Sequence, residues 1–278
     1  MITVSEHNIT RIGNNITLPD WLDDYIFNQL HARYRKKNRD LVVLNWDRDD
    51  ILSYLGTYFP RTFAESYCVF SDYFHQNQHS FNDRIAISIF DFGCGTGGEL
   101  VGLICAIQRE LPHVSEVNIK ALDGNQHALE ILELLLSQVS HHLNIDLDYK
   151  LSPIVIDDFY DLSIVRNVIN RKYDIFITFK AICEFVTLQQ FESRNPYSHI
   201  ISTFKDVLNQ DAIMCIADVT TYSDVSNDWL PKMMDRGVKE CGLDLVYQNE
   251  GYNETFLVSH SGKHNDVSKI AWRILINN

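Results

Sequence analysis

A short apolar run followed at once by a cluster of glycines constrains this chain more than any other feature. Residues 85–92 are apolar and β-prone, and a helical pattern runs from Glu99 to about residue 111. Four glycines lie within six positions between them: Gly93, Gly95, Gly97 and Gly98. A strand, a glycine loop and a helix in this order present free backbone N–H groups and a helix N-terminus to a ligand. We therefore expect a ligand-binding loop here.

The glycine spacing fits two kinds of ligand. Gly93, Gly95 and Gly98 satisfy G-x-G-x-x-G, which is typical of dinucleotide binding. With Asp91 included, Gly93, Gly95 and Gly97 satisfy (D/E)-x-G-x-G-x-G. An acid at the end of the strand suits a ligand that carries an ammonium group, so Asp91 favours the second pattern. A tight turn without a ligand is the third alternative, but four glycines are more than such a turn needs.

With its acid, the D-F-G-C-G-T-G segment resembles the first motif of the class I S-adenosylmethionine-dependent methyltransferases. This resemblance implies S-adenosyl-L-methionine as the cofactor. Asp123 ends the next strand about 30 residues later, where a carboxylate can accept both ribose hydroxyls of an adenosine. The resemblance also implies that an acid after the third strand meets the adenine amino group and that an apolar neighbour flanks the ring. The cofactor-binding residues we expect are Asp91, Gly93, Cys94, Gly95, Gly97, Asp123, Gly124, Asn125, Asp157, Asp158, Phe159 and Phe179.

From residue 83 onward, strand and helix patterns alternate. Strands are expected at 117–122, 151–156, 173–179 and 212–219, and helices at 126–143, 163–171, 197–208 and 228–241. The last three strands, at 243–247, 255–260 and 269–276, end in an antiparallel hairpin. The alternation predicts a doubly wound α/β sheet. A closing hairpin is the layout of the seven-stranded Rossmann-like methyltransferase fold, whereas a nicotinamide-binding half would repeat βαβαβ.

The first 82 residues read differently, as a helical region that precedes the cofactor domain. Helices are expected at about 47–55 and 60–74, with Pro60 in the first turn of the second. We therefore divide the chain into a helical lid or substrate region, 1–82, and a methyltransferase domain, 83–278. Arg61 lies in the first region and is a candidate partner for the methionine carboxylate or an acidic substrate, or else part of a surface ion pair.

The segment after the fourth strand, F-I-T-F-K-A-I-C-E-F, carries no acceptor motif of the kinds that methylate base amines or cytosine C5. Glu184 is the one weak candidate for a catalytic base or a substrate-orienting acid, and local capping is its alternative. A narrower similarity, to Rsm22-type methyltransferase-like proteins associated with ribosomes, rests on residues 54–64, the glycine loop and this segment. It implies an alternative function: an RNA- or ribosome-associated factor with little or no catalysis.

Composition limits the partners. The net charge of −13 disfavours general nucleic-acid binding. A basic run, Arg33, Arg35, Lys36, Lys37 and Arg39, is either a solvated helix end or an RNA contact. No apolar run is long enough to span a bilayer, the N-terminus lacks a signal-peptide pattern, and the six cysteines form no C-x-x-C pair. We expect a cytoplasmic protein with reduced thiols, no metal site, and a methyl acceptor of unknown kind.

Overall fold

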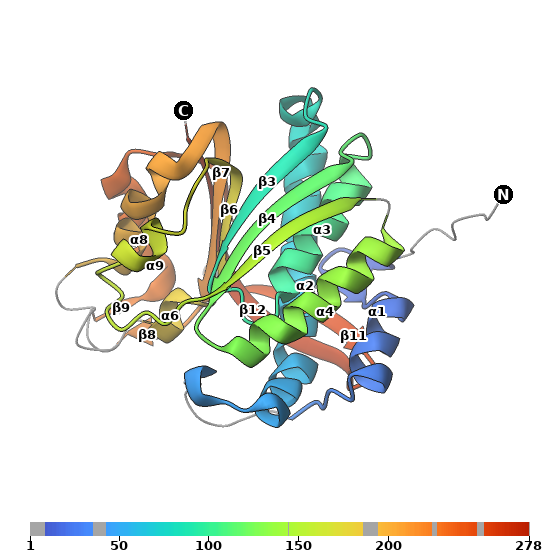
Figure 1. Cartoon of the computed structure of the whole chain (residues 1–278). Coiled ribbons are helices and arrows are strands. Elements are labelled where there is room, and N and C mark those ends of the chain that lie inside the picture. The colour runs from blue at the N-terminus through green and yellow to red at the C-terminus, as the bar shows by residue number, and fades with distance from the viewer. Residues whose placement is uncertain are drawn as a thin grey trace.

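The computed structural model describes residues 9–35, 43–143, 145–185, 194–223, 227–248 and 253–277. Its centre is a parallel sheet. The strand that leads into the glycine loop lies in the middle of this sheet, with neighbouring strands on both sides. In chain order these strands are β3 Ala86–Phe92, β4 Glu116–Asp123, β5 Asp146–Pro153, β6 Tyr173–Phe179 and β7 Leu208–Val219. They lie side by side in the order β7-β6-β3-β4-β5 (Figure 1). The order reverses at β3, so the carboxyl ends of β3 and β6 flank the point where a doubly wound sheet binds ligands.

The closing hairpin that the sequence predicted is present. β12 Lys263–Asn277 runs antiparallel to β7. Its other edge pairs with β10 Asp244–Gln248 at one end and with β11 Glu254–His260 at the other. The α/β fold class is therefore confirmed, but the described residues form a sheet of ten strands because N-terminal residues extend it: β2 Asn15–Thr17 pairs in parallel with β11, and β1 Arg11–Ile12 pairs with β2.

Each face of the sheet is covered by helices (Figure 1). Helices α2 Arg48–Asn77, α3 Gly98–Glu110 and α4 Gln126–His142 lie on one side, and α8 Pro196–Phe204 and α9 Leu230–Cys241 on the other. Alternate residues of a strand face opposite sides, so each strand contributes to both cores. In β3, Ile87 and Ile89 join the first hydrophobic cluster, whereas Phe90 and Phe92 join the second.

Shorter elements connect these layers. They are α1 Asp20–Asp24, a π-helical turn Tyr25–Gln29, α5 Ser163–Arg166, α6 Ile182–Phe185, the 3₁₀ turns Val43–Asn45, Gln78–Phe81 and Lys205–Val207, and the small hairpin of β8 Tyr222–Ser223 and β9 Asp228–Trp229. Among the residues described, no helix is both long and apolar enough to cross a bilayer.

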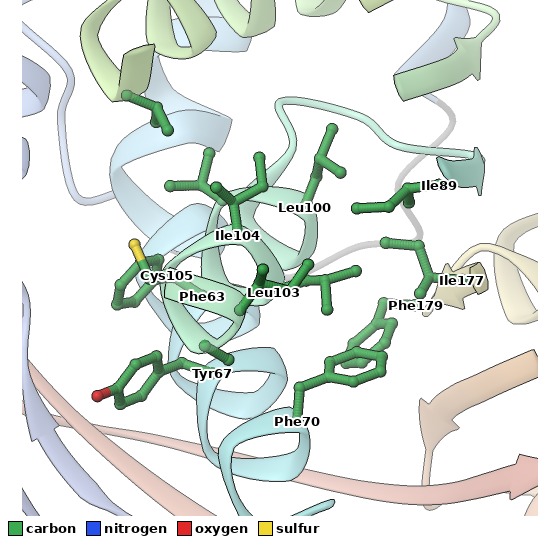
Figure 2. Packing of buried hydrophobic residues seen from close by; sticks show 14 of the residues in the cluster. Phe63, Tyr67, Phe70, Ile89, Leu100, Leu103, Ile104, Cys105, Ile177 and Phe179 are labelled. Atoms are coloured by element: carbon green, nitrogen blue, oxygen red, sulfur yellow. The ribbon is translucent and has the colours of Figure 1, made fainter. Parts of the chain in front are cut away.

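The prediction of two helices at 47–55 and 60–74 was wrong, because α2 is one helix of 30 residues with Pro60 inside it. Asp47 caps its N-terminus by accepting a hydrogen bond from the Asp50 N–H. A proline within a helix removes one backbone hydrogen bond, and here tertiary packing outweighs that loss. Figure 2 shows Phe63, Tyr67 and Phe70 from the second half of α2 packed among residues of α3 and the sheet.

Other boundaries also differ from the expected ones, for instance those of β7, β12 and α8. The third parallel strand is Asp146–Pro153, not 151–156. Its residues alternate between more and less buried because β5 is the edge of the sheet, and the alternation of D-L-D-Y-K-L was the signal. The helix expected at 163–171 ends at Arg166.

The division at residue 82 stays a prediction. The residues on its N-terminal side are nevertheless joined closely to the rest of the fold. Helix α2 crosses α3 along much of its length, and β2 is hydrogen-bonded into the sheet through β11. Buried residues of α2, α3 and β3 belong to one hydrophobic cluster.

Candidate functional site

The glycine loop adopts a conformation that only glycine takes readily. Gly95 and Gly97 have φ values of 47° and 78°, in the left-handed region. Gly97 is the residue at which the chain turns into α3. The N–H groups of Gly93 and Cys94 donate to the Leu122 carbonyl oxygen, both at 3.0 Å, which ties the loop to the end of β4. The loop is therefore held open above the carboxyl edge of the sheet.

Asp123 lies beside this loop, as its position at the end of the neighbouring strand predicts. Its Oδ2 accepts a hydrogen bond from the Gly95 N–H at 2.8 Å and its Oδ1 accepts one from the Asn125 N–H at 2.9 Å. Asn125 in turn caps α4, because its Oδ1 accepts from the Ala128 N–H. Burial raises the pKa of the Asp123 carboxyl group despite these donors. The carboxylate thus fixes the loop to the end of β4 and the start of α4.

Asp91 is the least satisfied group of the site. It is fully buried at the end of β3, and neither of its carboxyl oxygens has a hydrogen-bond donor among the described residues. Burial, and then the nearby charge of Asp123, raise its pKa well above the ordinary value. Burial and the proximity of Asp91 do the same for Glu99, in the first turn of α3. Three carboxyl groups therefore gather at one loop, where an anionic ligand would be repelled and a cationic one attracted.

A cavity of about 270 Å³ opens over the loop. One wall is the loop itself, residues 93–99. The facing walls come from distant parts of the chain: Tyr54, Tyr58, Arg61 and Thr62 of α2, Phe179 and Lys180 after β6, Cys183 and Glu184 of α6, Val219 at the end of β7, and Val267, Ser268 and Lys269 of β12. Among the described residues, no group of His, Cys, Asp and Glu side chains is arranged to hold a metal ion.

Of the expected binding residues, Gly93, Cys94, Gly95, Gly97 and Phe179 line this cavity. Asp91 lies buried at the end of the strand that leads into the loop, and Asp123 holds the loop from the side. Gly124 and Asn125 are covered by residues of the N-terminal region. The Asn125 amide donates to the Trp46 carbonyl oxygen at 3.1 Å, and a Cβ on Gly124 would lie 2.2 Å from Leu44 Cδ2.

Asp157, Asp158 and Phe159 do not line the cavity, because β5 ends at Pro153 and they lie in the connection that follows. Asp158 accepts a hydrogen bond from the Tyr160 N–H at 2.9 Å, and Phe159 is buried in the second hydrophobic cluster. Their expected contact with an adenine stays a prediction.

Arg61 and Glu184 both reach the cavity. The Arg61 guanidinium group forms a bidentate ion pair with Asp266, with Nε–Oδ2 and Nη2–Oδ1 distances of 2.6 and 2.8 Å. This pair joins α2 to β12. Asp266 is fully buried, so the pair is not the surface ion pair that was one alternative for Arg61. It is also a contact within the protein rather than one of the two ligand contacts expected for Arg61. Desolvation at the crowded cavity mouth, with contributions from Asp123 and Asp218, raises the pKa of Glu184 to about 8.

Sequence reasoning did not place Lys180, Ser268 and Lys269 in the site. Lys180 is the residue directly after β6, and its backbone has a φ of 56°, which is uncommon for a residue with a side chain. Ser268 and Lys269 lie almost 90 residues further on, in β12. The sequence pattern there predicts a strand of a hairpin, but it does not indicate that this strand borders the cavity. For these three residues, the sequence offered one signal of a place in the site, namely a position directly after the fourth strand, and only Lys180 has that position.

The basic run is described only in part. Arg33 and Arg35 lie in a segment without regular structure, so the predicted helix end is wrong for them. Their backbone N–H groups donate to the Leu52 carbonyl oxygen and to Thr57 Oγ1 of α2. Lys36, Lys37 and Arg39 lie outside the described residues, and an RNA contact there stays untested.

No protein-family model and no curated protein matches this chain. Solved structures similar to it include magnesium protoporphyrin IX methyltransferase from Synechocystis PCC 6803, at 9% identity and a TM-score of 0.47 over 92% of this chain and 98% of that one. A SAM-dependent methyltransferase from Aquifex aeolicus matches at 11% identity and 0.45, over 84% and 100% of the two chains. Precorrin-6y C5,15-methyltransferase from Geobacter metallireducens GS-15 matches at 10% and 0.44, over 74% and 87%. All three structures are similar to this chain at 9–11% identity, with TM-scores below 0.5.

Proposed function

We propose that this chain is an S-adenosylmethionine-dependent methyltransferase. The observation that carries the proposal is Asp91, a fully buried carboxyl group at the base of the glycine loop to which no described residue donates a hydrogen bond. Burying a carboxyl group without a partner is unfavourable unless something at the site compensates it. S-adenosylmethionine carries an ammonium and a sulfonium group, so its methionine end supplies positive charge beside Asp91 and Glu99.

The same carboxyl groups argue against a dinucleotide in this loop. A pyrophosphate normally lies on the free N–H groups of such a loop and the N-terminus of the helix that follows. Here Glu99 is buried in the first turn of α3, and Asp123 already accepts a hydrogen bond from the Gly95 N–H. A doubly charged pyrophosphate would lie among carboxyl groups, and the cationic cofactor fits this donor set better.

The roles of the residues follow from their places. Gly95 and Gly97 keep the loop open for the methionine portion, Asp91 and Glu99 favour its ammonium group, and Asp123 offers its carboxylate to the ribose hydroxyls. When bound, the cofactor supplies an electrophilic methyl group. The protein holds the acceptor in line with that group, and such alignment accounts for roughly 7–11 kcal/mol of barrier reduction in well-oriented reactions. Helix α2 covers the cavity and keeps water from it.

Calorimetric titration with S-adenosylhomocysteine and with NAD tests the proposal. We expect the wild-type protein to bind S-adenosylhomocysteine and not NAD. Hydrogen bonds to a charged group contribute roughly 1.5–3 kcal/mol. Asp123→Ala should therefore weaken S-adenosylhomocysteine binding by about 10- to 100-fold, since 1.4 kcal/mol is a factor of ten.

Asp148→Ala is the matched control, because Asp148 is an exposed carboxylate on β5, away from the cavity, and its loss should leave the affinity unchanged. Thermal melts of both variants separate lost binding from lost folding. Binding of NAD in place of S-adenosylhomocysteine would overturn the proposed function. Equal binding by wild type and Asp123→Ala would instead remove only the ribose role of Asp123.

A further inference from the structure

Carboxyl groups gather on one side of the cavity, and cationic side chains lie on the wall that faces them. The carboxyl groups of Asp91, Glu99 and Asp123 gather at the glycine loop. The facing wall, from α2, the end of β6 and β12, presents Arg61, Lys180 and Lys269. This positive wall stands out in a chain with a net charge of −13. If the cofactor occupies the acidic face, as the proposed function has it, the basic face borders the methyl acceptor.

Lys180 is held at this wall by a buried network. Its Nζ donates to Glu65 Oε1 at 2.6 Å and to Ser268 Oγ at 3.2 Å, and Ser268 Oγ also hydrogen-bonds to Glu65. Glu65 is fully buried, whereas the Lys180 side chain keeps 20% of its surface exposed and lines the cavity. The ammonium group is therefore anchored from behind and accessible from the cavity.

The backbone of Lys180 also has an uncommon conformation for a residue with a side chain. Its φ of 56° lies in the left-handed region, and its N–H donates to the Ala217 carbonyl oxygen at 2.8 Å, across to β7. Such conformations are unfavourable for residues with side chains and cluster at ligand sites. Together with the anchored ammonium group, this geometry directs a fixed positive charge to the edge of the cavity.

The charges on this wall do not cancel. Arg61 and Lys263 both pair with the single carboxylate of Asp266, at 2.6 and 2.9 Å. Glu65 pairs with Lys180, and Lys269 is exposed at the rim. Lys263 does not line the cavity, so three cationic side chains of this wall face two carboxylates. Burial, and then the charges of Asp123 and Asp218, raise the pKa of the neighbouring Glu184 to about 8.

We propose that the methyl acceptor is a small molecule with an anionic oxygen, a carboxylate or a phenolate, and that Lys180 and Lys269 bind this oxygen. The rings of Tyr54 and Tyr58, with centroids 4.9 Å apart, line the same cavity and provide a surface for an aromatic or apolar body. A cavity of about 270 Å³, enclosed by α2 and β12, suits a small molecule rather than a polymer.

This acceptor also accounts for the missing base. An oxygen that is already ionised attacks the methyl carbon directly: the O–CH₃ bond forms, the S–CH₃ bond breaks, and its electron pair stays on sulfur. The products are a neutral ester or ether and S-adenosylhomocysteine, so no proton has to be removed. The lysine charges hold the oxygen in its ionised form, which is the work a general base would otherwise do.

The test uses the full chain saturated with S-adenosylhomocysteine and three probes of similar shape: benzoate, benzamide and benzylamine. Ligand-observed NMR titration gives the affinity of each. We expect benzoate to bind at least about tenfold more tightly than benzamide, an interaction of 1.4 kcal/mol, and benzylamine to bind most weakly. Lys180→Met and Lys269→Ala should each reduce the preference for benzoate severalfold, and Lys180→Arg should retain it.

Two controls keep the result clear. Lys239→Met removes an exposed lysine of α9, away from the cavity, and should leave the preference unchanged. Because Lys180→Met leaves Glu65 buried without its cation, the double variant Glu65→Gln/Lys180→Met removes both charges and guards against misfolding.

Equal binding of benzoate and benzamide, tighter binding of benzylamine, or a benzoate preference that survives both lysine changes would overturn the inference. Failure of S-adenosylhomocysteine to bind would overturn the proposed function and this inference with it. Binding of S-adenosylhomocysteine without an anion preference would overturn the acceptor class alone.

Discussion

Asp91 shows at the scale of one residue how a binding site works against folding. The carboxyl group is fully buried, has no donor within the part of the chain that the structure describes, and lies near Asp123, which also has a raised pKa. Burial raises the pKa of such a group in the folded chain. At a pH where the group is ionised in the unfolded chain, this raised pKa lowers the free energy of unfolding. A side chain chosen for stability alone would be apolar here. The carboxyl group is therefore explained by a ligand, which supplies the positive charge that the protein does not.

Asp91→Asn should make the ligand-free protein more stable and the binding weaker. In the unfolded chain Asp91 has a pKa near the ordinary value of 3.8, and in the folded protein its pKa is raised. The wild type therefore loses stability as the pH rises from about 4 toward the folded-state pKa, by up to roughly 1.4 kcal/mol per pH unit from this group. The advantage of Asp91→Asn in thermal melts should grow over the same range. S-adenosylhomocysteine binding should fall by about 10- to 100-fold.

Asp148→Asn is the control for this comparison, since that carboxylate is exposed and should show neither effect. A variant that melts at the same temperature as the wild type across the pH range, and binds equally well, would mean that Asp91 has the same pKa in the folded and unfolded chain and does not contribute to binding.

Residues of the candidate site differed in how far the sequence revealed them. The glycine loop and Asp123 were predictable, because the carboxyl ends of neighbouring parallel strands meet at one edge. Lys180 and Ser268 were not, because their meeting depends on Glu65 of α2 and on the path of β12, which no local pattern contains. Arg61 was noticed, but its partner Asp266 is 205 residues away. Long-range ion pairs of this kind leave no trace in spacing.

At the scale of elements, the contact between α2 and α3 positions the cavity. Gly98 and Gly102, one turn apart on α3, lie against the backbone of α2. A Cβ on either would lie 2.6 Å from a carbonyl oxygen, that of Phe59 or of Phe63. Small residues at this spacing let two helices approach closely. The close approach brings Tyr58 and its neighbours on α2 over the glycine loop.

Gly102→Ala should therefore destabilise the protein although alanine favours helices. The gain in helix propensity is about 1 kcal/mol. Overpacking of a tight contact typically costs about 1–3 kcal/mol, and the obstacle here is backbone that cannot rotate away. We expect a lower melting temperature and, because α2 shifts, weaker S-adenosylhomocysteine binding. Ser137→Ala, on the exposed side of α4, serves as a helix control. A more stable Gly102→Ala would show that α2 yields easily.

Helices and strands were predictable from the sequence where one clear pattern of apolar residues ran through the whole segment. The strand at 173–179 is continuous and apolar, and the structure has it at those bounds. Helix α2 was divided in two because Pro60 suggests a helix start, whereas packing of both its halves overrides that local preference. The edge strand β5 was displaced because its half-buried alternation is weaker than the apolar run that follows it.

At the scale of the whole molecule, the N-terminal region is built into the fold. β2 extends the sheet beside β11, and the segment at residues 43–46 covers Gly124 and Asn125. Arg61 of α2 pairs with Asp266 of β12, and the Arg11 side chain pairs with Asp72. Sequence patterns place the N-terminal elements before residue 82. Only the tertiary contacts show that these elements pack against and pair with the rest of the chain.

A chain that starts at residue 82 should therefore fail to keep the native fold, although the division expected from the sequence makes residues 83–278 a domain of their own. Removing residues 1–81 takes away α2, which covers the apolar side of α3, and β2, which pairs with β11. The uncovered surface includes Leu103, Ile104 and Ile107, all fully buried in the whole chain. Loss of this burial removes a large part of the hydrophobic stabilisation of one face of the sheet. We expect no cooperative thermal transition, strong binding of the dye ANS and rapid proteolysis. If the chain from residue 82 instead melts cooperatively and binds no dye, residues 83–278 form an independent domain, and the N-terminal region is a separable cover over the site.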